Sequence, residues 1–315
     1  MIILFLTGAI GGLAWWAFGP VEGKSMPEVF TVTEDQNRLD VVIKLKEEKL
    51  IKNTGAFLLL LNFTAGEKAI LPGGYRLNRN MNAFQVLQKI TSKPDLVWVV
   101  IPEGFRKEQI GEILAKALNW NEDEQKKWNE VDTATKPEYV EGVYFPDTYL
   151  IPKDESGQEI AQRFINRFNE KFAPYLDKFA QKDILWTTGI KIASLIQREA
   201  AGAQDMPLIS GIIWNRLEKG MKLEIDATLQ YIRGDKDQGW WGRVNVADKL
   251  IDSAFSTYKY KGLPSKPICN PGLAAIEAAL NLAETDCLYY LHDHNRQIHC
   301  AKTYEEHKDN IRNFL

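Results

Sequence analysis

The sequence predicts an α+β protein that begins with a membrane helix and ends in a mostly helical domain. Three observations support this fold class. The first eighteen residues carry no charged side chain. Short apolar runs then alternate with amphipathic stretches as far as Leu118. From Ser156 onward helical spacing dominates, until two short runs at residues 287–292 and 297–301 predict a C-terminal β-hairpin.

Residues 1–20 have the composition of a single membrane anchor. Trp15, Trp16 and Phe18 gather at its far end, where aromatic rings favour the membrane interface, and about 20 apolar residues span a bilayer. A cleaved signal peptide is one alternative, but the usual basic start is missing and no clear cleavage site follows. A buried soluble helix is another, which the terminal position disfavours. No Lys or Arg asymmetry sets the orientation of the anchor.

Residues 21–93 read as a small α+β module. Predicted strands at 29–32 and 75–77 flank an amphipathic stretch at 39–50 and an apolar run at 56–63, and a helix at 82–90 follows. The module has no cluster of acids, His or Cys, which suits binding or spacing better than chemistry. Residues 94–155 form a connecting unit with a strand at 96–101, a helix at 107–118 and a packed turn or strand at 142–152.

Residues 156–315 form the predicted catalytic domain. Ser156 and Glu159 have capping-box spacing at the start of a helix to Phe172. Asp205-Met206-Pro207 starts another helix, which Gly220 stops. A Pro- and Gly-rich ordered loop at 256–272 is the expected place for a functional wall. Helices at 273–283 and 303–314 flank the predicted hairpin.

The stretch IKIASLIQREAAG, at residues 190–202, places an acid on an apolar helix face. Ile192, Leu195, Ile196 and Glu199 follow the i, i+3, i+4, i+7 spacing of one face. We expect Gly202 to end this helix in a left-handed cap. An acid in a partly apolar pocket has a raised pKa and can serve as a general acid. Spacing alone favours the simpler interpretation, an ion pair at a helix end.

Composition and spacing exclude several other classes. The net charge of −3 is unlike that of a nucleic-acid-binding protein, which needs a basic face. Three cysteines cannot form a closed disulfide framework, so we expect them to pack as small buried apolar residues. The set His292, His294, His299 and Cys300 lacks the spacing of zinc ligands, so no metal site is expected. No phosphate loop or nucleophile elbow occurs.

Four stretches, in this order, resemble the endolytic murein transglycosylase family, also described as YceG-like. They are EGVYFPDTYLIP (141–152), ASLIQREAA (193–201), GIIWNRLEKGMKLEIDATLQY (211–231) and STYKYKGLPSKPICNPG (256–272). Gln197 stands where members often have a second Glu, which leaves Glu199 as the only acid of this helix to match the catalytic one. Glu224 and Ser256 replace a Gln and an Asn of the family pattern, and Lys259 and Ser265 also depart from it.

The resemblance implies a membrane anchor, a LysM-like module and a catalytic domain of lysozyme-like character. It implies cleavage of the bond between N-acetylmuramic acid and N-acetylglucosamine in peptidoglycan strands, leaving 1,6-anhydro ends. Glu199 is the expected general acid and then base, with no cofactor. The expected substrate contacts are Asp226, Thr228, Gln230, Asn215 and Tyr258, although helix capping or packing explains Asn215, Gln230 and Tyr258 equally well.

Two other functions stay open at this point. One is a lysozyme-like muramidase in which Asp226 helps water to attack, and the other is an inactive, membrane-anchored peptidoglycan-binding protein. The resemblance further implies a bacterial cytoplasmic membrane location with the catalytic domain outside the cytoplasm. Glycan strands are then the expected partner, with cell-wall synthases as neighbours and no nucleic acid.

Overall fold

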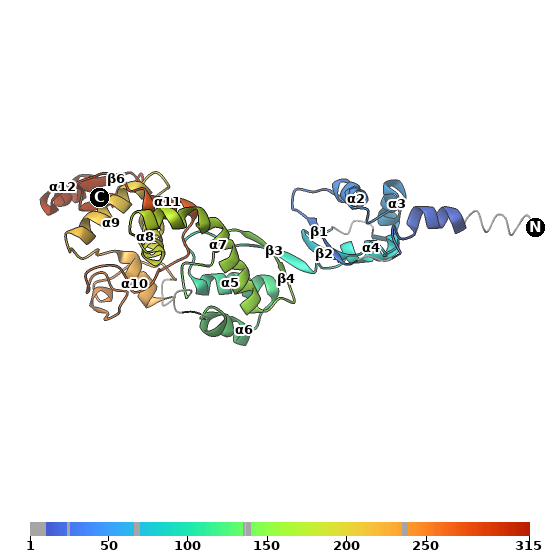
Figure 1. The fold of residues 1–315 in the computed structure, drawn as a ribbon, viewed down its shortest axis with the longest axis horizontal. Coiled ribbons are helices and arrows are strands. Elements are labelled where there is room, and N and C mark those ends of the chain that lie inside the picture. The colour runs from blue at the N-terminus through green and yellow to red at the C-terminus, as the bar shows by residue number, and fades with distance from the viewer. Residues whose placement is uncertain (1–10, 24–25, 66–69, 135, 137–139, 235–238) are drawn as a thin grey trace, which may run out of the picture. The chain divides into compact units, whose positions relative to one another are not determined.

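The computed structural model describes residues 11–23, 26–65, 70–134, 136, 140–234 and 239–315. These residues are mixed helix and sheet, and the chain divides into two compact units (Figure 1). The first unit comprises Met1–Val99 and Thr148–Glu155, and the second comprises Val100–Asp147 and Ser156–Leu315. The domain bounds predicted from the sequence, at residues 20, 93 and 155, stay predictions.

The predicted fold class is wrong in its first element, the membrane helix. Across the described ranges, no helix is both long enough and apolar enough to cross a membrane. The described helical part of the segment is residues 11–18, which at 1.5 Å per residue is far shorter than a ~30 Å hydrocarbon core. Residues 1–10, on which the rest of the prediction falls, lie outside the described residues.

The first unit holds a four-stranded sheet and, after the helical residues 11–18, the helices α2 (Arg38–Glu47), α3 (Thr54–Ala65) and α4 (Ala83–Ile90). Its strands are β1 (Glu28–Val32), β2 (Gly73–Leu77), β3 (Leu96–Val100) and β4 (Thr148–Pro152), which lie in that order. The strand β2 pairs antiparallel with β1 and with β3. Asn37 and Asn82 start α2 and α4 with capping boxes, and residues such as Phe30, Leu45 and Val86 form a fully buried core.

The second unit is mainly helical. Its elements before the candidate site are α5 (Lys107–Leu118), α6 (Glu122–Lys127), a π-helix (Trp128–Asp132) and α7 (Gly157–Gln181). After these come α8 (Trp186–Glu199), α9 (Met206–Glu218), α10 (Asp226–Arg233), a short 3-10 helix (Asp248–Leu250) and α11 (Leu273–Leu280). The strands β5 (Tyr289–His292) and β6 (Ile298–Ala301) and the helix α12 (Tyr304–Phe314) end the chain.

The helix α8 is the centre of the second unit. It packs against α7, α9, α10 and α11 (Figure 1). Ile192, Leu195 and Ile196 are fully buried, as the helical spacing predicted. The predicted end is wrong, however, because α8 stops at Glu199 and Ala200 is extended at φ −70°, ψ 137°, so that Gly202 plays no part in the cap. Glu199 is therefore the last residue of the helix.

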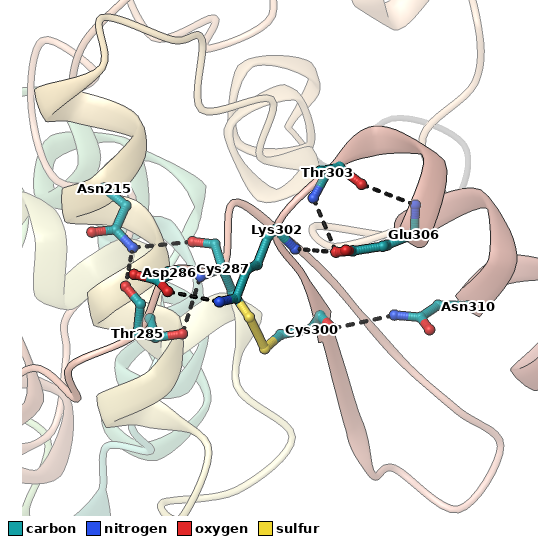
Figure 2. The surroundings of a disulfide bond; sticks show 9 residues. All are labelled: Asn215, Thr285, Asp286, Cys287, Cys300, Lys302, Thr303, Glu306 and Asn310. Atoms are coloured by element: carbon teal, nitrogen blue, oxygen red, sulfur yellow. Dashed lines mark hydrogen bonds and ion pairs between the residues drawn. A yellow bond between two sulfur atoms is a disulfide. The ribbon is translucent and has the colours of Figure 1, made fainter.

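A disulfide closes the C-terminal hairpin. The strands β5 and β6 pair antiparallel with Tyr290 opposite Cys300, and Cys300 is bonded to Cys287, just before β5 (Figure 2). The expectation that all three cysteines are simple apolar residues is therefore wrong for this pair, because the hairpin brings residues thirteen positions apart together. Cys269 is a free buried thiol.

Candidate active site

A cavity of about 540 Å³ in the second unit brings together Glu199, Asp226 and Tyr258, three of the site residues expected from the sequence. Side chains from α8, α9, α10, β5 and α12 line it. Its lining residues are the acids Glu199, Glu224 and Asp226, the cations Arg216 and Lys249, the aromatic residues Tyr258, Tyr289, Tyr290, Tyr304 and His307, and Leu223. This volume is within the usual range of small-molecule sites, about 300–1,000 Å³.

Glu199 lies in this cavity with one carboxylate oxygen held by a phenol. The Tyr290 hydroxyl donates to Glu199 Oε2 at 2.5 Å, and the backbone N–H of Ala227 also donates to the carboxylate. Burial raises the pKa of Glu199, and the nearby charge of Asp226 adds to this rise, whereas the Tyr290 hydrogen bond and the Arg198 charge oppose it. The net shift is upward, toward the protonated form that a general acid needs.

Asp226 and Tyr258 form a second pair in the same cavity. Asp226 is the exposed first residue of α10, and its Oδ1 accepts a 2.5 Å hydrogen bond from the Tyr258 hydroxyl. Tyr258 belongs to the Pro- and Gly-rich loop, and Lys249 lies over its ring at 4.8 Å from the centroid. The phenol of Tyr258 thus has a pKa above its ordinary value, mainly from burial and then from this hydrogen bond.

Arg216 fixes the hairpin to the segment before α10. Its guanidinium donates to the carbonyls of Leu288 at 2.5 Å and Leu223 at 2.7 Å, and lies 3.6 Å from Glu224. The same group covers the Tyr289 ring at 4.9 Å. Because Arg216 is buried and its hydrogen bonds go to the backbone, its first role is to position the cavity wall.

The other three predicted contacts, Thr228, Gln230 and Asn215, do not line this cavity. Thr228 is fully buried and donates to the Ile225 carbonyl, while Gln230 donates to the carbonyls of Trp241 and Gly242. Asn215 donates to the carbonyls of Thr285 and Cys287, at the base of the hairpin (Figure 2). Their polar atoms serve neighbouring segments, and a contact with substrate stays a prediction for them.

Glu141 and Gly142, at the start of the stretch 141–152, hold the Pro- and Gly-rich loop 256–272 in place. Glu141 is 1% exposed and accepts hydrogen bonds from Asn270 Nδ2 at 2.7 Å and from the Lys107 backbone at 3.2 Å. Burial, followed by the charge of Glu108, raises its pKa. Gly142 has φ +88°, and a Cβ there would lie 2.8 Å from both Ile190 and Pro267. Only glycine fits at position 142, between Ile190 of α8 and Pro267 of the loop.

Two of the histidines considered as metal ligands, His292 and His299, have carboxylate partners, and the cysteine of the set has another bond. His292 Nε2 lies 3.2 Å from Asp205 Oδ2, His299 Nε2 lies 3.0 Å from Asp293 Oδ2, and Cys300 is in the disulfide. Among the residues that the structure describes, no group of three or more His, Cys, Asp or Glu side chains is placed to hold a metal ion.

Sequence reasoning missed Tyr290, the residue in direct contact with Glu199. The two are 91 positions apart, and no local spacing relates them. The sequence signal that could have indicated it is the pair Tyr289-Tyr290 in the predicted strand at 287–292. Tyr289, Tyr304 and His307 were not predicted for the same reason, whereas Arg216 lies in the quoted stretch 211–231 but was given no role.

Comparisons with known proteins identify the family of the chain. The sequence profile of the YceG-like family matches residues 30–313. The endolytic murein transglycosylase of Bacillus subtilis (strain 168) is 30% identical over 285 residues, which cover 84% of this chain and 78% of that protein. The protein of the same name from Streptococcus pneumoniae serotype 2 (strain D39) is 24% identical over 330 residues, covering 93% of this chain and 59% of that longer protein.

A solved structure has a similar fold. The crystal structure of a putative YceG-like protein from Listeria monocytogenes superimposes with a TM-score of 0.62 at 25% sequence identity. The match covers 90% of this chain and 99% of that one.

Proposed function

The chain belongs to the YceG-like family, and on this basis we propose that it is an endolytic lytic transglycosylase of peptidoglycan. It cleaves the bond between N-acetylmuramic acid and N-acetylglucosamine within glycan strands. The observation that carries the mechanism is the partly buried Glu199, whose pKa is raised and whose Oε2 is bound by Tyr290. Glu199 is the only acid of α8 within the stretch 193–201.

In the first step Glu199 acts as the general acid. Because Tyr290 binds Oε2, the proton for the glycosidic oxygen is on Oε1. Its transfer breaks the bond to the anomeric carbon through an oxocarbenium-like transition state. The Tyr290 hydroxyl and the Ala227 N–H then stabilise the carboxylate that forms.

In the second step the same carboxylate acts as the base. It takes the proton from the 6-hydroxyl of the muramic acid ring as that oxygen attacks the anomeric carbon, which forms a 1,6-anhydro end and restores protonated Glu199. The nucleophile belongs to the substrate, so one acid is sufficient. Asp226, the first residue of α10, is bound by the Tyr258 hydroxyl and supports the site in the same cavity.

One observation favours a second candidate, a muramidase that uses water. Asp226 lines the same cavity as Glu199 and interacts with it electrostatically, and hydrolytic glycosidases use two carboxylates. The two reactions leave different product ends, which separates them.

The disulfide supports action outside the cytoplasm, where peptidoglycan lies. Disulfides such as Cys287–Cys300 persist in oxidising compartments and are rare in reducing ones. Glycan strands are the proposed partner, and an association with cell-wall synthases stays a prediction.

The test is to incubate the protein with purified peptidoglycan and identify the released fragments by mass spectrometry. We expect anhydro-ended fragments from the unaltered protein and a loss of at least a hundredfold for Glu199→Gln, which cannot donate a proton. The matched control is Glu224→Gln, an acid of the same cavity that is ion-paired to Arg216.

Equal loss in both variants, or full activity of Glu199→Gln, would overturn the assignment of Glu199. Reducing-ended fragments would replace the transglycosylase with the muramidase.

A further inference from the structure

Three neighbouring aromatic side chains line the candidate active-site cavity and contact neither Glu199 nor Asp226. They are Tyr289, Tyr304 and His307, here called the aromatic wall. The His307 ring is nearly parallel to that of Tyr289, with centroids 5.4 Å apart and 22° between planes. The Tyr304 ring lies 5.8 Å from Tyr289 and 6.4 Å from His307.

The wall is built by the hairpin and α12 together. Tyr304 is the first residue of α12, and His307 follows one turn later on the same face. Consecutive side chains of a strand point in opposite directions, so Tyr290 of β5 reaches Glu199 while Tyr289 packs against α12. Tyr289 of the wall is thus the neighbour in β5 of Tyr290, which binds the proposed acid Glu199.

Packing of α12 onto the hairpin accounts for Tyr289, but it does not account for Tyr304 and His307. Tyr304 exposes 57% of its surface, although it is a large aromatic residue at a cavity. His307 Nδ1 is buried, and it has no hydrogen-bond partner in the described part of the chain. An exposed aromatic ring beside an unpaired polar atom is typical of a surface that a ligand completes.

The imidazole of the wall is also uncharged near neutral pH. Burial and the nearby Arg216 lower the pKa of His307, so its neutral imidazole predominates. Arg216 lies over the Tyr289 ring at 4.9 Å and Lys308 over the Tyr304 ring at 5.3 Å. Aromatic rings beside cations fit the apolar face of a pyranose ring, whose hydroxyl rim can pair with phenol and imidazole groups.

We propose that the aromatic wall is a sugar-binding subsite, which packs against one pyranose ring of the glycan strand that Glu199 cleaves. This proposal rests on the proposed function, since it takes its ligand from that substrate.

The first test measures binding without turnover. In the Glu199→Gln background, the dissociation constant for soluble peptide-free glycan strands is measured by calorimetry for Tyr304→Ala and His307→Ala. We expect each to weaken binding by about five- to tenfold, the loss of one aromatic contact. The control is Phe314→Ala, which removes an aromatic residue of α12 that packs on His299 and does not line the cavity. It should leave binding unchanged.

The second test uses the active protein. For Tyr304→Ala we expect KM to rise by the same factor while kcat at saturating substrate is unchanged. Equal affinities for all variants, no binding by the Glu199→Gln parent, or a fall in kcat alone would overturn the subsite. If the parent binds strands through the wall but the unaltered protein never cleaves them, the subsite stands and the proposed function fails.

Discussion

At the scale of single residues, two opposing effects set the pKa of Glu199. Burial raises the pKa of Glu199, and the hydrogen bond from Tyr290 lowers it. In the proposed mechanism the first effect keeps a proton available for the leaving oxygen, and the second stabilises the carboxylate once the proton has left. Tyr290 therefore adjusts the acid without taking part in bond making.

We predict that Tyr290→Phe moves the alkaline limb of the rate profile to higher pH. The variant removes a donor that favours the carboxylate, so the pKa of Glu199 rises further and the protonated acid persists at higher pH. The shift should be about one pH unit and the fall in kcat about tenfold, the effect of one hydrogen bond to a charged group. The measurement is kcat/KM against pH.

Tyr258→Phe is the matched control, because it loses an equal hydrogen bond to Asp226 instead of Glu199. An unmoved limb in Tyr290→Phe, or the same upward shift in both variants, would contradict the role of Tyr290.

At the scale of elements, the hairpin is the part of the site most dependent on a covalent bond. Cys300 lies opposite Tyr290 in the ladder, and its carbonyl accepts from Asn310 of α12 (Figure 2). Cys287, at the other end of the bridge, has its carbonyl bound by Asn215 of α9. The disulfide thus connects α9, β5, β6 and α12 around the side chains that face Glu199.

We predict that Cys287→Ala/Cys300→Ala lowers both stability and turnover. Removing a native disulfide with a loop of this length costs about 2–4 kcal/mol in the free energy of unfolding, and the loosened hairpin holds Tyr290 less firmly. Thermal unfolding and glycan cleavage with and without reductant are the measurements. Reductant should affect the unaltered protein and Cys269→Ala but not the double variant. An unaltered protein that is insensitive to reductant in both assays would contradict this.

At the scale of the whole molecule, periodic elements could be predicted from the sequence and long-range contacts could not. The buried face of α8 follows from Ile192, Leu195 and Ile196, and α5 has the predicted bounds. The π-helix at Trp128 and the end of α8 depend on tertiary packing that overrides local signals. The Tyr290 contact and the disulfide join residues through the hairpin, which spacing cannot reveal.

Because long-range contacts cannot be read from residue spacing, the candidate site could be predicted only in part. A helical pattern places Glu199 on a buried face, and motif resemblance adds Asp226 and Tyr258, which the structure brings into one cavity. Thr228 and Asn215 belong to the same stretch of sequence, yet their hydrogen bonds go to the backbone of nearby segments. A motif therefore identifies the neighbourhood of a site, and the fold decides which side chains face it.

The central claim is that the substrate's own hydroxyl, and not water, attacks the anomeric carbon activated by Glu199. The most direct measurement is cleavage of glycan strands in water enriched in oxygen-18, followed by mass spectrometry of the new ends. We expect anhydro ends that carry no oxygen-18. Incorporation of one labelled oxygen at the anomeric carbon would contradict it and assign Asp226 the activation of water.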